Sequence, residues 1–316
     1  MAEGLLDLEG AAFLRRDAVA EGYTDRAIAA LVAHGEWHRL RRGAYCSGLL
    51  WRSLSTADRH RLLARAVLRT AHPSAVLTHH SAAIEHGAPV WGRDLGIVHL
   101  TRTDGRAGRR EAGVVQHRGV LPDSHVVPVN GVRASHPTRV AVEMSTTGSV
   151  ESTLVTVNGI LHMGLSTPEA VATLTGDMRF WPRSLAADLV IRLADPRVES
   201  VGESRTLFLC WDQHLPRPCP QVEVRDEHGL VVARLDFAWP EHGVFLEFDG
   251  REKYFRHRLE GEGLEEFLLR EKRREELVCL LTGWVCIRIS WTDLARRQQT
   301  GRRIRALLAR RTSQGA

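Results

Sequence analysis

Four charged side chains in the last third of the chain have the types and spacing of a phosphodiester-cleaving site: Asp236, Glu247, Asp249 and Lys253. Carboxylate oxygens are the ligands that hard divalent cations such as Mg²⁺ prefer. An ammonium group beside such an ion can stabilise the charge that develops on a phosphate. We therefore expect Asp236 and Glu247 to bind Mg²⁺ or Mn²⁺, with Asp249 as third ligand or general base. Lys253 would stabilise the phosphate.

A small sheet backed by helices is expected to carry these side chains. Alternating apolar and polar residues predict strands at 221–225, 230–238 and 244–249. A helix at 264–281 and a further strand at 284–290 are expected to follow. The acidic residues would then lie on neighbouring strands.

The faces of these strands follow from their geometry, because residues two apart in a strand point to the same side. Asp236 is expected on one face of its strand, with Leu235 and Phe237 on the other. By the same rule Glu247 and Asp249 share a face of the next strand. The acidic residues would thus lie on the polar faces of the two strands, and the apolar residues would lie on the opposite faces.

A hairpin loop centred on residues 241–242 would place Asp236 directly opposite Glu247. Two carboxylates so close repel each other, and a divalent cation between them converts the repulsion into binding. The alternative is a solvated face on which each acid pairs with an arginine. Arg234 and Arg251 are near enough in sequence to do so.

Glu203 is a further candidate for the site. It begins an expected helix and shares a stripe with Leu207 and Trp211 that would face the sheet. The alternative is a capping box, because Ser200 and Glu203 match the pattern S-x-x-E. Gln221, on the first strand, is a minor candidate.

The N-terminal residues predict a winged helix-turn-helix. Helices are expected at 10–20 and 24–34, the second capped by Thr24 and ended by Gly35, followed by a strand pair with its turn at residues 42–43. Basic side chains in such a module contact DNA phosphates. The alternative is a small helical domain that binds protein. The expected DNA-contacting residues are Arg26, Arg39, Arg41 and Arg42, to which we add Lys272.

The region between, at 51–195, is expected to be an α+β domain. It predicts strands around 96–101, 113–119 and 125–135. Its histidines at 79, 80 and 86 have no carboxylate at ligand spacing, so we expect no metal site there. The predicted domains are therefore 1–50, 51–195 and 196–316, in a mixed α+β chain.

Composition restricts the binding partners and the cellular compartment that we expect for the chain. The chain has 41 arginines but two lysines, and seven of the arginines fall in the last 24 residues. Such a segment suits a polyanion, although a solvated basic helix is the alternative. Five scattered cysteines without a CxxC pair, an acidic N-terminus and no long apolar run predict a reduced, cytoplasmic protein with no membrane span.

Residues 203–291 resemble the very-short-patch-repair-like branch of the PD-(D/E)XK nuclease superfamily, on the stretches ESRTLFLCWDQHLPRPCPQVEV, RLDFAWPEHGVFLEFDGREKY and EKRREELVCLLTGWVCIRISW. The resemblance implies a helix-strand-strand-strand-helix-strand core, a divalent metal and phosphodiester hydrolysis. It implies metal binding by Asp236 and Glu247 and a match of Glu203 to the core-helix glutamate. Asp249 stands where many relatives carry the lysine of E-x-K, so Lys253 would be a displaced lysine or would stand where some relatives place histidine.

Residues 13–45 (FLRRDAVAEGYTDRAIAALVAHGEWHRLRRGAY) and the segment from LTHHSAAIEHGAP to ASHPTRVAVEMS resemble AbiEi-family antitoxins of type IV toxin–antitoxin systems. That resemblance implies promoter binding and autoregulation. A nuclease tail is not part of the antitoxin pattern.

Together these features predict a DNA-directed, Mg²⁺- or Mn²⁺-dependent endonuclease of DNA repair or defence, positioned by its winged helix. The first alternative is a non-enzymatic DNA-binding regulator or antitoxin whose nuclease-like domain is degenerate. The second is an interaction module that acts on a cognate toxin or defence-system protein.

Overall fold

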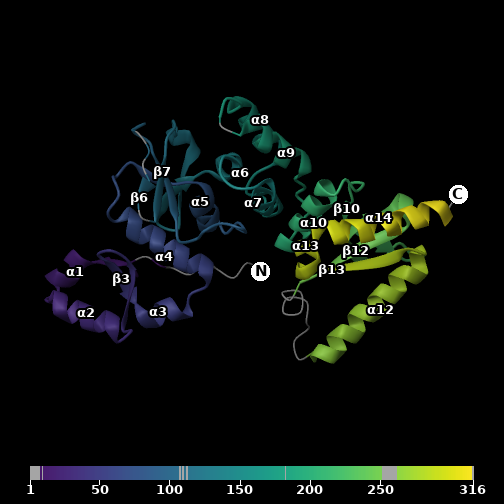
Figure 1. Ribbon diagram of the computed structural model, residues 1–316, viewed down its shortest axis with the longest axis horizontal. Coiled ribbons are helices and arrows are strands. Elements are labelled where there is room, and N and C mark those ends of the chain that lie inside the picture. Colours follow the sequence, from purple (N-terminus) through teal and green to yellow (C-terminus); the bar gives the residue numbers. More distant parts are fainter. Residues whose placement is uncertain are drawn as a thin grey trace. The chain divides into compact units, whose positions relative to one another are not determined.

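The computed structural model describes residue 8 and residues 10–314, apart from positions 107, 109, 112, 182 and 251–261. It is mixed α+β, as the sequence predicted, with 48% of the described residues helical and 21% in strands. Its contacts divide it into two compact units, whose elements are labelled in Figure 1. Unit 1 contains the described residues up to Thr156 and Met163–Leu189, and unit 2 contains Val157–His162 and the described residues from Val190 onward. Among all the described residues, no helix is both long and apolar enough to cross a bilayer.

Unit 1 begins with two short helices and a β-hairpin, in the order that the sequence predicted. The three strands of this N-terminal part form an antiparallel sheet in the order β1-β3-β2. The hairpin turns at Arg42 and Gly43, as expected. The elements are β1 (Phe13–Leu14), α1 (Arg15–Ala20), α2 (Asp25–Ala33), β2 (Trp37–Arg41) and β3 (Ala44–Ser47).

Local capping explains the bounds of these helices. The hydroxyl of Thr24 accepts a hydrogen bond from the backbone N–H of Ala27 at 3.2 Å, which caps α2. Gly35, with φ +74°, ends α2 in the left-handed conformation that glycine adopts most easily. The first helix begins at Arg15 and not at residue 10, as the sequence had suggested, because the residues before it pair with β3 as a strand.

The second part of unit 1 is built on a six-stranded mixed sheet in the order β6-β7-β5-β4-β9-β8. The parallel pairs are β5 with β7 and β4 with β9, and the other pairs are antiparallel. The strands expected near 96–101, 113–119 and 125–135 are confirmed as β5, β7 and the β8–β9 hairpin. The elements are α3 (Gly48–Ser53), α4 (Thr56–Leu68), β4 (Ala75–Leu77), α5 (His79–Glu85), β5 (Val98–Arg102), β6 (Arg110–Glu111), β7 (Val114–His117), β8 (Val126–Val129), β9 (Val132–Ser135), α6 (Pro137–Ser145), α7 (Val150–His162), α8 (Pro168–Asp177) and α9 (Ser184–Leu193). The C-terminal residues of α7 and of α9 belong to unit 2.

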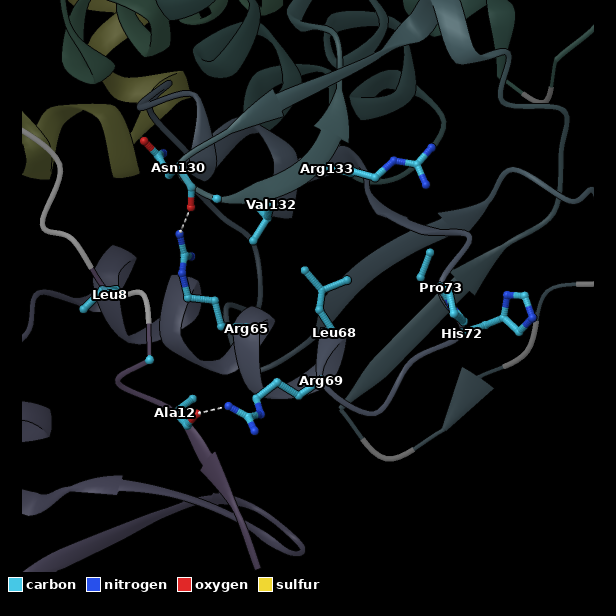
Figure 2. Close-up of a pocket in the computed structure, with 13 residues that line it drawn as sticks. Leu8, Ala12, Arg65, Leu68, Arg69, His72, Pro73, Asn130, Val132 and Arg133 are labelled. Carbon is cyan, nitrogen blue, oxygen red and sulfur yellow. Dashed lines mark hydrogen bonds between the residues drawn. The ribbon is translucent and has the colours of Figure 1, made fainter. Parts of the chain in front are cut away.

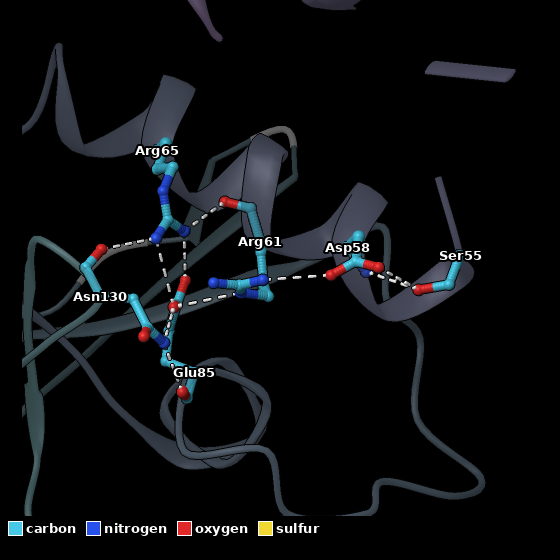
Figure 3. Close-up of polar contacts among 6 residues, drawn as sticks. All are labelled: Ser55, Asp58, Arg61, Arg65, Glu85 and Asn130. Atoms are coloured by element: carbon cyan, nitrogen blue, oxygen red, sulfur yellow. Dashed lines mark hydrogen bonds and ion pairs between the residues drawn. The ribbon is translucent and has the colours of Figure 1, made fainter. Parts of the chain in front are cut away.

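A buried ion cluster joins α4, α5 and the β8–β9 turn (Figure 3). The carboxylate of Glu85 is completely buried and lies 2.5 Å from Arg65 Nη1 and 3.4 Å from Arg61 Nε. Arg65 also donates to the backbone carbonyl of Asn130 at 2.7 Å, and the Asn130 amide donates to the carbonyl of Glu85 at 2.8 Å. Asn130 and Gly131 both have positive φ, the requirement of a tight two-residue hairpin turn. The cluster therefore fixes that turn against the two helices.

Unit 2 contains a four-stranded sheet in the order β10-β11-β12-β13, in which only β12 and β13 are parallel. A helix, three strands, a helix and a strand follow one another along the chain, as the sequence predicted. The elements are α10 (Val201–Asp212), β10 (Cys219–Arg225), β11 (Val231–Trp239), β12 (Val244–Asp249), α12 (Leu264–Thr282), β13 (Val285–Ser290), α13 (Trp291–Ala295) and α14 (Arg297–Gln314).

Helices cover both faces of this sheet, with α12 and α14 on opposite sides of it in Figure 1. Leu207 of α10 and Ile304 of α14 belong to one apolar cluster, together with Leu246 of β12. Val278 of α12 belongs to a second cluster, which includes Phe245 of β12. Successive residues of β12 thus face different helices, as the strand period requires.

We predict that Glu85→Gln destabilises unit 1 by about 3–5 kcal/mol, because it leaves two buried guanidinium groups without their shared carboxylate. Urea unfolding followed by circular dichroism measures the change. Asp25→Asn is the matched control, because the ion pair of Asp25 with Arg15 lies at the surface and contributes little. Equal unfolding midpoints for the two variants would show that the cluster does not hold unit 1 together.

Candidate functional site

Asp236 lies where the pairing of β11 with β12 ends. The ladder runs from Trp239↔Val244 to Phe237↔Leu246, and in this register the next position sets Asp236 opposite Glu247, as predicted. The carboxylate of Asp236 accepts a hydrogen bond from the backbone N–H of Phe248 at 2.8 Å. A side-chain oxygen thus continues the contact between the strands where the ladder stops.

The alternation of β11 changes at the same residue. Leu235 packs in the cluster of α12, whereas Phe237 packs in the cluster of α10 and α14. The prediction that Leu235 and Phe237 share a face is therefore wrong. On β10, Gln221 is opposite Asp236 in register and has φ +56°, a strained conformation for a residue other than glycine. Two neighbouring strands are thus irregular at the level of Asp236.

β12 keeps the predicted alternation, so Glu247 and Asp249 face α12. Glu247 Oε1 lies 3.4 Å from Arg274 Nη2 of that helix. Asp249 Oδ1 lies 2.8 Å from Arg288 Nη1 of β13, and Arg288 also pairs with Glu275 at 2.7 Å. Burial opposes the charged form of Arg288, but its bond to Glu275 and the charge of Asp249 raise the pKa of this guanidinium above its usual value.

Glu203 forms the predicted capping box, and its carboxylate also lines the cavity described below. Ser200 Oγ accepts from the Glu203 N–H at 3.1 Å and donates to the Glu203 carboxylate at 2.7 Å, which caps α10. The same carboxylate accepts from Gln221 Nε2 at 2.9 Å, so it also reaches the irregular strand. Leu207 is buried as expected, but Trp211 is 42% exposed, so its expected place against the sheet is wrong.

One cavity of about 300 Å³ brings these groups together. Five of its lining residues are acidic and three are arginines, so it combines ion-binding oxygens with phosphate-binding guanidinium groups. Within it Asp236 is 7% exposed and Glu247 is 3% exposed, so both carboxylates are buried. The lining residues are Glu199, Glu203, Gln221, Arg234, Asp236, Glu247, Phe267, Arg270, Glu271 and Arg274.

The contribution of α12 to this cavity was missed by the sequence analysis. Phe267, Arg270, Glu271 and Arg274 recur at the three- and four-residue spacing of one helix face, a signal that was available in the sequence. Burial would lower the pKa of Arg274, but the charges of Glu247 and Glu271 outweigh it and raise that pKa above its ordinary value.

The other predicted site residues lie elsewhere. Lys253 lies outside the described residues. Asp249 and Lys272 do not line the cavity, and Lys272 is exposed on α12. In unit 1, Arg26 is exposed on α2, and the hairpin of β2 and β3 carries Arg39, Arg41 and Arg42, of which Arg41 is half-buried and the others exposed.

Among the described residues, the group of three potential metal ligands that comes together is not acidic. It consists of His79, His99 and His117, whose ligand atoms all lie within 4.8 Å of one another. We expected no metal site around His79 and His80 because only ligands close in sequence were compared. His99 and His117 are distant in sequence and come from strands β5 and β7.

A second cavity, of about 370 Å³, lies in unit 1 (Figure 2). Three arginines line it, and each has an acidic neighbour: Arg65 pairs with Glu85, Arg69 donates to the carbonyl of Ala12 and pairs with Asp17, and Arg133 lies 3.7 Å from Asp123 at the surface. Its charge is therefore already neutralised, and the acidic cavity of unit 2 is the stronger candidate.

We predict that Gly202→Ala disturbs the acidic site. A Cβ at Gly202 would lie 2.1 Å from the ring of Phe248, whose N–H holds Asp236. The clash should lower the free energy of unfolding by about 1–3 kcal/mol. Gly176→Ala in α8 is the control, because nothing lies within 4 Å of its Cβ position and alanine is the better helix former. Urea unfolding compares the two variants, and an unchanged stability of Gly202→Ala would contradict the packing of α10 on β12.

No protein-family model matches the chain. Two proteins of Mycobacterium tuberculosis, from strains CDC 1551 / Oshkosh and ATCC 25618 / H37Rv, are each 28% identical to it over 188 residues. The match covers 60% of this chain and 65% of each relative, which is less than two thirds of their length. Both relatives are described only as uncharacterized proteins, so the similarity joins the chain to them and brings no activity with it.

Proposed function

We propose that the chain is a metal-dependent endonuclease that hydrolyses phosphodiester bonds in DNA in the cavity of unit 2. The observation that carries the proposal is the pair of buried carboxylates, Asp236 and Glu247, which line one cavity with three arginines. A buried pair of acids suits a cation, and guanidinium groups suit the phosphate of a substrate.

The donor set fits Mg²⁺ or Mn²⁺. These ions are commonly held by one or two carboxylates, with water and substrate phosphate completing the coordination. Asp236 and Glu247 supply such a pair. When bound, the ion would supply Lewis-acid polarisation of the phosphoryl group and activation of water. Asp249 would have to exchange Arg288 for the ion to act as the third ligand.

The residues around the pair have separate tasks in this proposal. The N–H of Phe248 fixes the orientation of the Asp236 carboxylate. Gln221 links β10 to Glu203 and so fixes the wall of the cavity opposite α12. Arg270 and Arg274 would bind the non-bridging oxygens of the scissile phosphate, because guanidinium groups bind phosphate in a fork geometry. Lys253 keeps its proposed role in stabilising the phosphate.

The order of elements in unit 2 supports the same reading. The succession α10-β10-β11-β12-α12-β13 is the one implied by the resemblance to very-short-patch-repair-like nucleases. The acids implied as ligands by that resemblance fall at the end of the β11–β12 ladder and on β12.

DNA is the proposed polymer because of unit 1. Two short helices followed by a β-hairpin are the elements of a winged helix-turn-helix. Exposed Arg26, Arg39 and Arg42 would contact phosphates there, which orient a protein on DNA without reading its sequence.

The alternative is a DNA-binding regulator or antitoxin without nuclease activity, whose partner would be a cognate toxin or defence-system protein. One observation favours it: Glu247 and Asp249 each lie in contact with an arginine, so their charge is balanced without an ion. On this view the hairpin arginines, and not the acids, are the functional residues.

We expect the purified chain to nick supercoiled plasmid in the presence of Mn²⁺ or Mg²⁺, and to stop when a chelator is added. Asp236→Asn should lower the rate by about 100-fold or more, because loss of a metal ligand removes several kcal/mol of transition-state stabilisation. Glu223→Gln, an exposed acid of the same sheet, should leave the rate unchanged. No nicking by the wild type, or equal nicking after Asp236→Asn, would defeat the enzymatic proposal.

We also expect the double variant Arg39→Ala, Arg42→Ala to bind duplex DNA more weakly, with a salt dependence shallower by about one unit of slope for each lost phosphate contact. Fluorescence anisotropy at several salt concentrations measures both. Arg225→Ala, an exposed arginine of unit 2, is the control. Binding that depends on the hairpin without any nicking would support the regulator, and binding unaffected by the double variant would remove the hairpin from the DNA interface.

A further inference from the structure

The parallel pairing of β5 with β7 brings two histidines onto one face of the sheet of unit 1. His99 is opposite Val115, and Thr101 is opposite His117. Because residues two apart share a face, His99 and His117 are diagonal neighbours on that face. His99 Nδ1 lies 2.9 Å from His117 Nε2.

The start of α5 adds a third imidazole to this pair. The ring of His79 stacks on that of His117, with centroids 3.7 Å apart and planes at 17°. Its centroid lies 5.3 Å from that of His99. His79 has φ +53°, a conformation that costs a non-glycine residue free energy. The fold thus holds this side chain against the other two at the expense of local strain.

Burial disfavours the charged form of the imidazoles in this cluster. His79 is 4% exposed, and His99 and His117 are half-buried. Burial, together with the neighbouring histidines, lowers the pKa of His79 well below its usual value, and burial lowers that of His117 to about 4. Neutral imidazoles with available lone pairs are the form that binds metal ions.

We propose that His79, His99 and His117 form a binding site for a divalent late transition-metal ion of the Zn²⁺ class. The acids of unit 2 offer oxygen to hard cations, whereas three imidazole nitrogens select Zn²⁺, Co²⁺, Ni²⁺ or Cu²⁺. All three potential ligand atoms lie within 4.8 Å of one another. Tetrahedral Zn²⁺ with Zn–N bonds of about 2.0–2.1 Å needs nitrogens about 3.3 Å apart, so small rotations of the rings suffice.

The surroundings supply a partner for the ring nitrogen of His79 that does not bind the ion. His79 Nδ1 lies 3.0 Å from Thr78 Oγ1, and its Nε2 lies 3.2 Å from Thr146 Oγ1. Whichever nitrogen binds, the other keeps a hydroxyl that orients the ring, as is usual around metal-binding histidines. Glu143 adds a nearby negative charge, because its carboxylate accepts from the His79 backbone N–H at 3.1 Å.

One neighbouring group opposes a cation. Burial is the main cause that lowers the pKa values of His79 and His99, and the charge of Arg93 adds a small part to it. Its guanidinium is turned to other partners, since it donates to the carbonyl of Thr147 at 2.7 Å and to that of Met144 at 3.1 Å. It weakens binding by its charge and does not occupy the space among the imidazoles.

The test is a titration of the metal-free full chain with Co²⁺, followed by its visible absorption, and then displacement by Zn²⁺. The double variant Asp236→Asn, Glu247→Gln is used in parallel, so that ions in the acidic cavity do not contribute. We expect one Co²⁺ per chain in the double variant, with the intense absorption of a tetrahedral site, and the same intense absorption in the wild type. A rise in the unfolding temperature with Zn²⁺ is the second readout.

His99→Gln and His117→Gln should each weaken binding by about tenfold or more. His72→Gln, at an exposed histidine of the same unit, should bind as the wild type does. Circular dichroism confirms which variants are folded, and one folded variant, of His99 or of His117, is enough for the test. Absence of tetrahedral Co²⁺ absorption in the wild type, or its persistence in a folded His99 or His117 variant, would overturn the site.

Discussion

Two carboxylates buried on adjacent strands, Asp236 and Glu247, are the constraint from which the candidate site of unit 2 follows. A buried charge needs hydrogen bonds or an opposite charge, because water no longer solvates it. Asp236 receives the N–H of Phe248, and Glu247 has Arg274 beside it. The end of the ladder leaves a backbone N–H for Asp236, and α12 supplies an opposite charge for Glu247. Gly202 allows α10 to approach β12 at the same level.

Unit 1 shows how the same constraint is met without a site. Glu85 is as deeply buried as Glu247, but two guanidinium groups and an amide contact its carboxylate. The cavity of about 370 Å³ in unit 1 is lined by its partners Arg65 and Asn130 but not by Glu85, whereas Asp236 and Glu247 themselves border a cavity of about 300 Å³. Buried charge alone therefore does not separate a structural cluster from a functional one. A buried carboxylate that itself lines open space does, because a ligand needs both the charge and the room to reach it.

The order of elements in unit 2 and the register of its central hairpin were predictable from the sequence. Alternation and turn residues specify them, since a slip by one residue would expose an apolar face. The change of face at Asp236 was not, because it coincides with a positive φ at Gln221 on the neighbouring strand, and glutamine carries no local signal for that conformation. The residues of α12 that line the cavity recur at the spacing of one helix face. This spacing predicts that they lie on the same side of the helix, but it does not predict that this side lines a cavity.

The histidine cluster marks the limit of reading ligands from spacing. His79, His99 and His117 come from a helix and two strands, and only the parallel pairing of β5 with β7 brings the last two together. A parallel pair needs a crossover connection, so its partners are distant in sequence by construction. Local spacing detects ligands that share a loop or a helix, and it misses those that a sheet assembles.

The two candidate ion sites differ in the chemistry of their donors, and this allows their roles to be separated. Mg²⁺ has little affinity for imidazole, so it would leave the histidines empty at concentrations that support hydrolysis at the acids. Zn²⁺ accepts both nitrogen and carboxylate ligands, but three nitrogens at short range hold it better than two carboxylates of which one already contacts an arginine. A chelator removes both ions and cannot distinguish the sites. Restoring activity with Mg²⁺ alone, while the histidines stay empty, would assign the chemistry to the acids and leave the imidazoles a role in holding α5 against the sheet.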